Sequence, residues 1–246
     1  MKIALVTGAS RGLGAAVALG LAEAGWGVAV NYARDGASAE RVAAAIRADG
    51  GHAVAVGFDV TKTEEVARGL VEIGNVLGPT DLVVNNATGP QAGHPIMEQT
   101  WDHYEAHLQI FLKAPLLILQ RLLPDWRQRR SGRVINIGSE VTEVGPALEA
   151  HYVSAKAAMI GLTRSWASEL GPEGITVNLV SPGWVPVERH EGTSAEIYRE
   201  HLRRVPLGRM GAPRDVAGTV VFVASSAADY ITGHNFVVNG GRTFSS

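Results

Sequence analysis

Short runs of apolar, mostly β-branched residues recur along this chain, and longer segments with apolar positions three or four apart separate them. The longer segments have helical periodicity, as at Val66, Leu70, Ile73 and Leu77. A strand with one face in water alternates apolar and polar residues, so continuous apolar runs are typical of strands buried on both faces. The pattern predicts seven strands, in segments 2–8, 27–33, 52–60, 81–87, 132–139, 175–183 and 235–241.

Strands that alternate with helices predict the fold class α/β. We expect a doubly wound, Rossmann-like, seven-stranded parallel sheet with helices on both faces. No repeat, low-complexity tract or long linker interrupts the alternation, so a single domain over residues 1–246 is expected. One segment departs from the pattern, because residues 184–212 are longer and more polar than an ordinary connection. It follows the sixth strand, where such sheets open toward ligands, and we interpret it as a substrate loop.

Composition narrows the classes of partner. A chain of 246 residues that is 46% hydrophobic can bury a large core, and a net charge of −2 gives no reason to expect nucleic acid or an anionic membrane. The absence of cysteine excludes disulfides, thiolate metal sites and a cysteine nucleophile. The first predicted strand begins at once, leaving no room for a signal peptide, and no apolar run reaches 18 residues. The expected location is the cytoplasm.

A glycine-rich segment, TGASRGLG, follows the first predicted strand and leads into a helix expected to start near Ala15. Gly8, Gly12 and Gly14 permit a tight turn and a close backbone approach, while the helix N-terminus offers free N–H groups to a pyrophosphate. The alternative is a turn with no ligand. Because the segment lacks the Gly-Lys-Ser/Thr ending of a P-loop, a kinase is disfavoured, and the context favours a dinucleotide.

The end of the second strand indicates which dinucleotide. A carboxylate there would bond a ribose 2′-hydroxyl and repel a 2′-phosphate, but Tyr32 occupies the position. Arg11 in the glycine segment and Arg34 beyond the strand could both bind a phosphate. The alternative is two solvated surface arginines. We therefore predict NADP(H) in preference to NAD(H).

Three further residues suggest acid–base chemistry. Tyr152 and Lys156 are four positions apart in a predicted helix, so they share a face, and Ser139 ends the fifth apolar run. A positive charge at ~4 Å, in an effective dielectric of ~20, favours a phenolate by about 4 kcal/mol. Tyr152 could then give a proton to a carbonyl oxygen or take one from an alcohol, while Ser139 bonds the same oxygen. Taken singly, the three could equally be a core tyrosine, a surface lysine and a strand-end serine.

Together these motifs, with Asn-Asn-Ala at 85–87 and Ser-Pro-Gly at 181–183, resemble the short-chain dehydrogenase/reductase family over essentially the whole chain. The pattern is similar to bacterial 3-oxoacyl-carrier-protein reductases and glucose dehydrogenases. The resemblance implies a homotetramer or homodimer that packs through helices near 101–129 and 152–170. It also implies that Lys156 binds the nicotinamide ribose. The expected cofactor-binding residues are Gly8, Ser10, Arg11, Gly12, Leu13, Gly14, Tyr32, Arg34, Asp59, Val60, Asn86, Ala87, Tyr152, Lys156, Pro182, Gly183 and Val185.

Three positions depart from the family pattern, and one of them is Thr88, which follows Asn-Asn-Ala where glycine is common. Phe111 stands where the family usually has an asparagine that orders a water-linked proton path, and Val187 stands where a threonine often bonds the nicotinamide carboxamide. A phenyl ring cannot bond water, so we expect the helix face at 111 to be dry. Proton supply to the tyrosine would then use another route.

Two polar clusters have simpler interpretations. His103 and His107 are four apart, but the intervening glutamate falls off their face, so no metal site is expected. Glu188, Arg189 and His190 in the substrate loop could bind a polar substrate, although such clusters are more often solvated.

The motifs predict an NADP(H)-dependent oxidoreductase that reduces a ketone or 3-oxoacyl carbonyl to an alcohol, or catalyses the reverse. Ser139, Tyr152 and Lys156 are its expected catalytic residues. The alternative is a non-catalytic NADP-binding sensor or scaffold, which the changes at Phe111 and Val187 would suit. The motifs specify a reaction and not a substrate.

Overall fold

Seven parallel strands form one sheet in the order β3-β2-β1-β4-β5-β6-β7. This computed structural model describes residues 1–188 and 192–244. The predicted α/β class and parallel sheet are confirmed, and all seven predicted strands are present, each shorter by one to four residues than its apolar segment. The strands are β1 Ile3–Val6, β2 Gly27–Tyr32, β3 Ala53–Gly57, β4 Thr80–Asn85, β5 Gly132–Ile137, β6 Ile175–Pro182 and β7 Asn235–Val238.

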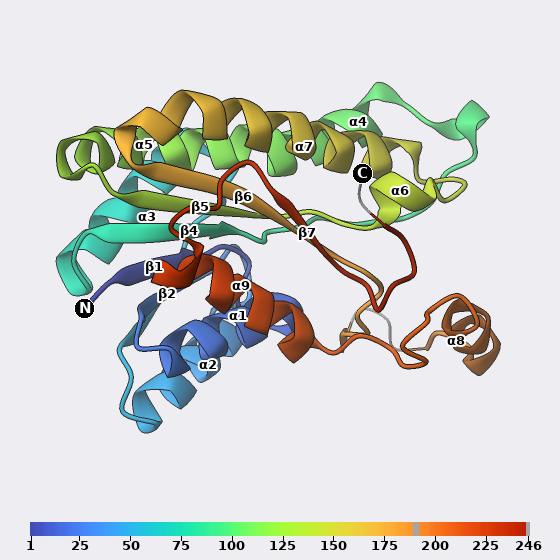
Figure 1. The fold of residues 1–246 in the computed structure, drawn as a ribbon, viewed down its shortest axis with the longest axis horizontal. Helices are drawn as coiled ribbons and strands as arrows, with labels where there is room; N and C mark the ends of the chain where they lie inside the picture. The colour runs from blue at the N-terminus through green and yellow to red at the C-terminus, as the bar shows by residue number, and fades with distance from the viewer. Residues whose placement is uncertain (189–191, 245–246) are drawn as a thin grey trace.

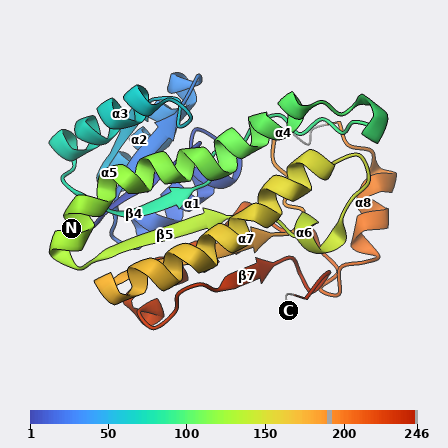
Figure 2. The ribbon, with the colours of Figure 1, turned by 90° about the horizontal axis from the view of Figure 1, so that it is seen from above.

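Helices cover both faces of the sheet (Figure 1; Figure 2). One layer contains α1 Gly12–Glu23, α2 Gly36–Ala48 and α9 Pro213–Ala224. The other contains α3 Thr63–Val76, α4 Trp101–Leu108, α5 Ala114–Arg129 and α7 Ala150–Leu170. A π-helical turn, Gln109–Lys113, joins α4 to α5. The short helices are α6 Val141–Val144 and α8 Ala195–Leu202, with single 3-10 turns at Ile96–Glu98, Gly171–Glu173 and Ser226–Ala228.

The strands are apolar on both sides because two separate cores enclose them. Along β1, Ala4 and Val6 belong to the core beneath α1 and α9, whereas Ile3 and Leu5 belong to the core beneath α3, α5 and α7. All four residues are buried. Burying a large aliphatic side chain stabilises by about 1.5–3 kcal/mol, so this continuous run is what a strand between two helical layers requires.

The order of the strands reverses between β1 and β4, which creates a crevice at their carboxyl ends. The glycine segment follows β1 and Asn86 follows β4, so both lie at this point. The first helix begins at Gly12 and not near Ala15 as expected, because Arg11 is extended (φ −162°) and serves as its N-cap residue. The glycines thus form the first turn of α1 as well as the loop before it.

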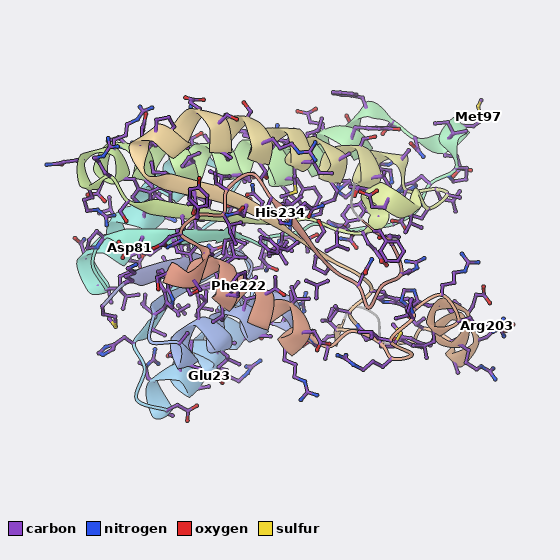
Figure 3. The ribbon with its side chains drawn as sticks, viewed as in Figure 1. Glu23, Asp81, Met97, Arg203, Phe222 and His234 are labelled. Carbon is purple, nitrogen blue, oxygen red and sulfur yellow. The ribbon has the colours of Figure 1, made fainter. Side chains whose placement is uncertain are left out.

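Two segments extend beyond the same end of the sheet. Met97 marks the tip of the connection between β4 and α4, and Arg203 marks the end of α8 in the segment after β6 (Figure 3). Both follow the carboxyl ends of strands, where a ligand crevice opens. The polar segment 184–212 therefore contains a helix of its own, placed beside that opening.

One helical stretch in the described part of the chain, Trp101–Arg129, is long and apolar enough by composition to cross a membrane. Core helices pass the same test. Its α5 portion packs on α3 and on β4, and Ile118 and Trp126 are fully buried there. These two residues belong to the core between the helix and the sheet.

Candidate active site

The glycine segment leaves no space for side chains where it approaches the loop after β4. Gly8 has a φ of +60°, and a Cβ on it would lie 2.9 Å from the Cα of Ala87. A Cβ on Gly14 would lie 2.4 Å from the oxygen of Gly8 and 2.5 Å from Nδ2 of Asn86. These contacts require glycine at both positions. They bring the backbone of this segment and the α1 N-terminus to the crevice, as a pyrophosphate cradle needs.

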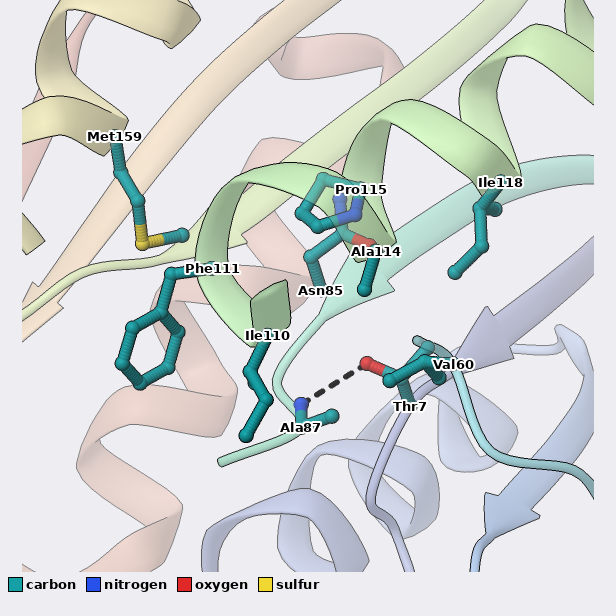
Figure 4. A pocket seen from close by; sticks show the side chains of 10 residues that line it. All are labelled: Thr7, Val60, Asn85, Ala87, Ile110, Phe111, Ala114, Pro115, Ile118 and Met159. Carbon is teal, nitrogen blue, oxygen red and sulfur yellow. Dashed lines mark hydrogen bonds between the residues drawn. The ribbon is translucent and has the colours of Figure 1, made fainter. Parts of the chain in front are cut away.

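A threonine that the sequence reasoning missed holds the two sides of this crevice together. The Oγ1 atom of Thr7 accepts hydrogen bonds from the backbone N–H groups of Asn86 (2.9 Å) and Ala87 (3.0 Å). Figure 4 shows the second of these bonds. Asn86 Nδ2 donates in turn to the oxygens of Thr7 (2.9 Å) and Gly8 (3.1 Å). The position of Thr7 directly before Gly8 was the available signal.

The end of β2 carries an aromatic residue where an acid would select NAD. The ring of Tyr32 packs over two glycines, since a Cβ on Gly57 would lie 2.8 Å from its hydroxyl and one on Gly36 would lie 3.0 Å away. The preceding Asn31 is buried and accepts a hydrogen bond from the Gly8 N–H at 3.2 Å. The Asn31 hydrogen bond thus fixes the end of β2 to the glycine segment. No carboxylate is present at this strand end, because residue 32 is a tyrosine.

The two arginines expected at a 2′-phosphate are both exposed. Hydrogen bonds from Ser38 lower the pKa of Asp35, and the Arg11 guanidinium adds a smaller effect. Burial raises the pKa of Asp59, but hydrogen bonds from the following threonine and smaller effects that include the Arg34 charge outweigh it and lower the pKa. Arg11 and Arg34 therefore flank the end of β2, each near a different carboxylate.

The three expected catalytic residues come from β5 and α7. Tyr152 and Lys156 are buried in the first two turns of α7, 7% and 5% exposed. Ser139 is half-buried and lies two residues beyond β5, where its Oγ accepts a hydrogen bond from the N–H of Val141 at 3.3 Å. Lys156 Nζ donates to the carbonyl oxygen of Ile137, the last residue of β5, at 2.7 Å. That bond joins the tyrosine-bearing helix to the strand that leads to the serine.

Phe111 and Met159 also contact Lys156. Its Nζ lies 3.8 Å from the centre of the Phe111 ring and 3.8 Å from the Sδ of Met159. Figure 4 shows these two side chains beside each other. The Nζ atom lies 5.8 Å from the centre of the Tyr152 ring, so the ammonium and the phenol share one face of α7.

Phe111, which the family resemblance puts in the place of an asparagine, contacts Lys156. Its ring face receives the ammonium in a cation–π interaction, worth about 0.5–2 kcal/mol. The ring is 2% exposed and lies in the π-helical turn. It lines a cavity of about 10 Å³ with Asn85 and Met159, space for at most about one water molecule. A cavity of this size has no room for a chain of water molecules beside the ring.

The segment after β6 crosses the glycine segment. Pro182 ends β6, Gly183 N–H donates to Val238 at 2.8 Å, and Val185 is buried. A Cβ on Gly12 would lie 3.4 Å from the side chain of Val187. The expected nicotinamide-binding backbone thus lies close to the expected pyrophosphate-binding backbone. Ser10 and Leu13 are half-buried within the glycine segment, and Val60 is buried at the end of the connection from β3.

A buried chain of amides that sequence reasoning did not identify connects the strands behind the site. Asn85 Nδ2 donates to Asn136 Oδ1 at 2.8 Å, and Asn136 Nδ2 donates to Thr163 Oγ1 at 2.9 Å. The first bond links β4 to β5, and the second links β5 to α7. Buried amides are retained when they are fully bonded, so this chain fixes α7 against the sheet. In the sequence, Asn85 was identified only as the first residue of the Asn-Asn-Ala segment.

Four histidines gather beside Tyr152. His107 and His151 stack with ring centres 4.9 Å apart, and the rings of His94 and His103 stack at 4.0 Å. His151 lies 5.7 and 5.9 Å from the second pair, and the ring of His107 meets that of Tyr152 edge-on at 5.4 Å. The cluster joins α4, α7 and the connection before α4. Only two of the four histidines had been noted from sequence.

Burial disfavours the charged form of two members of this cluster, His107 and His151. Burial lowers the pKa of His107 from 6.5 to about 4, and the charges of His151, Lys156 and His103 act in the same direction. Burial and then His94 and His103 lower the pKa of His151. No group of three or more His, Asp or Glu side chains in residues 1–188 and 192–244 is placed to hold a metal ion. The stacked pair of His107 and His151, in which burial favours the neutral form, thus lies beside Tyr152.

Part of the substrate loop lies outside the described residues. Arg189 and His190 are among the undescribed positions, so their suggested role in binding a polar substrate stays a prediction. Glu188 is exposed, and its Oε2 would lie 3.2 Å from a Cβ on Gly12.

Known proteins resemble this chain over its full length. A family model described as enoyl-(acyl carrier protein) reductase matches residues 8–243. The 3-oxoacyl-acyl-carrier-protein reductase FabG of Staphylococcus aureus is 42% identical over 242 residues, covering 98% of this chain and 97% of that protein. The solved structure of a gluconate 5-dehydrogenase from Burkholderia cenocepacia, in complex with NADP and tartrate, is 30% identical with a TM-score of 0.92 and covers 100% and 96%. A dehydrogenase/reductase from Sinorhizobium meliloti is 33% identical with a TM-score of 0.90, covering 99% and 95%.

The histidine cluster predicts acid sensitivity. A histidine whose pKa is about 4 when folded and ~6.5 when unfolded binds its proton first in the unfolded state, so stability is lost as the pH falls from ~6.5 toward 4. For His107 alone the expected loss at pH 5 is on the order of 2 kcal/mol. Urea unfolding at pH 7.5 and pH 5 measures it. In His107→Leu the loss should be smaller by about that amount.

His52→Gln is the matched control, because His52 is exposed and lies outside the cluster. It should keep the wild-type pH dependence. If His107→Leu loses as much stability as the wild type over the same pH interval, burial of neutral His107 is not the cause.

Proposed function

The chain belongs to the short-chain dehydrogenase/reductase family, and from that premise we propose that it is an NADP(H)-dependent oxidoreductase of a small carbonyl or alcohol. In the reductive direction a ketone or 3-oxoacyl carbonyl becomes an alcohol. One observation carries the proposal most directly. The Lys156 ammonium is buried beside Tyr152 and bonded to the end of β5, two residues before Ser139.

The residues of the crevice fit a dinucleotide. Glycine is required at Gly8 and Gly14, and no side chain there would obstruct a pyrophosphate at the start of α1. Asn86 and Ala87 would line the adenosine side, and Lys156 would bind the nicotinamide ribose. When bound, the reduced nicotinamide supplies a hydride to the carbonyl carbon. The named relatives include a structure in complex with NADP, which supports the choice of cofactor.

The chain's own residues supply the proton and its control. Tyr152 donates the proton of its hydroxyl to the carbonyl oxygen, and in the reverse direction it accepts the proton of an alcohol. Ser139 donates a hydrogen bond to the same oxygen and orients the substrate. The Lys156 ammonium favours the resulting phenolate, and the Ile137 carbonyl and the Phe111 ring hold that ammonium in place.

Phe111 changes how the proton of Tyr152 is replaced. The phenyl ring occupies the space behind Lys156, and the adjoining cavity of about 10 Å³ holds at most about one water molecule. A chain of waters behind the lysine would not fit there. We infer that the tyrosine regains its proton from the substrate side of the site or through the ribose hydroxyl.

Further properties follow from family membership as proposals. The relative named 3-oxoacyl-acyl-carrier-protein reductase supports a 3-oxoacyl substrate. The structure named gluconate 5-dehydrogenase supports a hydroxylated carboxylate, so the proposal names a class of carbonyl or alcohol and no individual compound. We infer a cytoplasmic homotetramer or homodimer that packs through α4, α5 and α7, where Trp101 and Leu116 are exposed. Light scattering after gel filtration measures the assembly.

The first expected outcome concerns Tyr152→Phe, which removes the proton donor while keeping the ring. Turnover should fall by about 10²–10⁴-fold, the usual contribution of general acid–base catalysis. NADPH affinity should change little, because the substitution leaves the glycine segment intact. Steady-state reduction of a panel of ketones and 3-oxoacyl thioesters measures the rate, and fluorescence titration measures the affinity.

A wild type that binds NADPH but reduces no member of the panel would favour the sensor or scaffold interpretation. An active wild type whose Tyr152→Phe variant loses less than ~10-fold in rate would instead remove Tyr152 from the proposed role while keeping the enzyme.

The second outcome concerns the cofactor. We expect tighter binding of NADPH than of NADH by ~10-fold or more, since charge-assisted hydrogen bonds from Arg11 and Arg34 contribute about 1.5–3 kcal/mol each. Arg34→Ala should narrow the difference, whereas Arg68→Ala, a change at an exposed arginine in α3, serves as the control. Equal or tighter binding of NADH by the wild type would assign NAD(H) instead.

The third outcome tests the dry face at Phe111. In the wild type we expect a solvent deuterium isotope effect on turnover, because proton supply contributes to the limiting step. Phe111→Asn should change that effect, while Phe111→Leu, which stays apolar, should retain it. Because a buried amide without partners costs ~1–3 kcal/mol, thermal stability is measured alongside. If Phe111→Asn folds and leaves both rate and isotope effect unchanged, Phe111 acts in packing alone.

A further inference from the structure

The residue after the proposed catalytic serine is a buried acid. Glu140 is 3% exposed, and its N–H donates to the oxygen of Pro182 at 2.9 Å. Its carboxylate points toward the end of β6, where a Cβ on Gly183 would lie 3.3 Å from Oε2. Oε2 is buried and has no hydrogen-bond partner among the described residues. Glu140 thus connects Ser139 to the backbone proposed to bind the nicotinamide.

The partner of this acid comes from the other end of the chain. Arg242 forms an ion pair with Glu140 Oε1, and the side chains are 18% and 4% exposed. Arg242 belongs to a turn after β7 that Asn239 organises by accepting the N–H of Gly241 at 3.0 Å. Asn239 also packs on Gly183, since a Cβ there would lie 2.7 Å from the asparagine's Cβ. The turn and the ion pair therefore approach the same glycine from two sides.

The same turn holds the far end of the substrate loop. The N–H of Leu207 donates to Gly240 at 3.1 Å, and Val205 lies 2.7 Å from where a Cβ of Gly240 would be. Gly240 has a φ of +67°, so another residue there would be strained as well as crowded. Residues 239–242 consequently contact both the loop that is proposed to choose the substrate and the acid beside Ser139.

Helix α8 also approaches this ion pair. His201 is buried, and its pKa is lowered first by burial and then by the Arg242 charge, whereas Glu140 acts in the opposite direction. Both members of the pair are therefore within electrostatic reach of that imidazole. The ring of His201 meets that of Trp184 edge-on at 5.0 Å, and both line a cavity of about 100 Å³ with Val205.

A buried ion pair of this kind adds little net stability but strongly fixes geometry. Removing one partner leaves the other charge without compensation inside the protein, and such a charge moves toward water. For Glu140 that movement would carry the adjoining Ser139 with it, because the two residues share a peptide bond. Misplacement of a catalytic group by ~1 Å can lower a rate by as much as ~10²-fold.

We propose that Arg242 and Glu140 are positioning residues that tie the C-terminal turn to Ser139 and keep the serine aligned with Gly183 and the substrate loop. The inference rests on the proposed carbonyl reduction and extends it to a residue near the end of the chain. Neither side chain transfers a proton or touches substrate. Their effect acts through Ser139 and the loop.

Three variants test the pair. Arg242→Met removes the charge, Arg242→Lys keeps it, and Arg242→Met with Glu140→Gln removes both charges. Arg127→Met is the matched control, because Arg127 pairs with Glu173 at 2.6 Å on the surface, in α5 and away from the site. The readouts are kcat and KM for the carbonyl, NADPH affinity, and hydrogen–deuterium exchange of peptides covering residues 137–144 and 200–208.

We expect kcat of Arg242→Met to fall by about 10–100-fold with a smaller change in NADPH affinity. Arg242→Lys should retain most of the rate, and the double variant should recover part of the loss because no uncompensated carboxylate remains. Exchange should rise in both peptides in Arg242→Met and not in Arg127→Met. If Arg242→Met does not fold, Arg242→Lys and the double variant are compared with the wild type instead. A double variant with the wild-type rate would overturn the proposal.

Two results separate this inference from the proposed function. A wild type without activity on any carbonyl would remove the proposed function, while the exchange measurement would still show whether the pair orders residues 137–144. Exchange in Arg242→Met equal to that in Arg127→Met, or raised exchange with unchanged kcat, would overturn the positioning role in an active enzyme.

Discussion

The need to accommodate one buried ammonium shapes the centre of this protein. Lys156 lies in a nearly dry interior, where an uncompensated charge is costly. The Ile137 carbonyl and the face of Phe111 compensate it, and these groups come from β5 and from the π-helical turn. Meeting that one demand therefore fixes α7, β5 and the α4–α5 stretch relative to one another, and Tyr152 and Ser139 are placed as a result.

The fold could be predicted from sequence because its signals are local and repeated. Each strand is a continuous apolar run, and each run is required by a core on both faces of the sheet. The glycine segment could also be predicted from sequence. The contacts of Gly8 and Gly14 allow no other residue, so the structural constraint appears directly as glycine in the sequence. The exact start of α1 was not, because an extended Arg11 at the N-cap leaves no compositional signal.

The neighbours of the site residues were harder to predict because they come from distant parts of the chain. The sequence indicated that Phe111 departs from the family pattern. It did not indicate that the phenyl ring packs against the Lys156 ammonium, which only the structure shows. Thr7 gave little signal because a threonine after a strand is common, yet its hydroxyl bonds the loop after β4. His107 stacks on His151, which lies 44 positions later in the chain on another helix. Hydrophobic periodicity describes only neighbouring positions, so it could not predict this contact.

The π-helical turn at Gln109–Lys113 has a consequence for chain length. Such a turn accommodates one residue more than a regular helix would, and each residue of an α-helix rotates the chain by about 100°. A relative with one residue fewer here would continue α4 into α5 without interruption. If it kept Phe111 under the lysine, the helix before it would be rotated by about that angle, and His107 would leave the tyrosine. A single deletion would therefore separate the contact between Lys156 and Phe111 from the histidine cluster. A related chain could have either feature without the other.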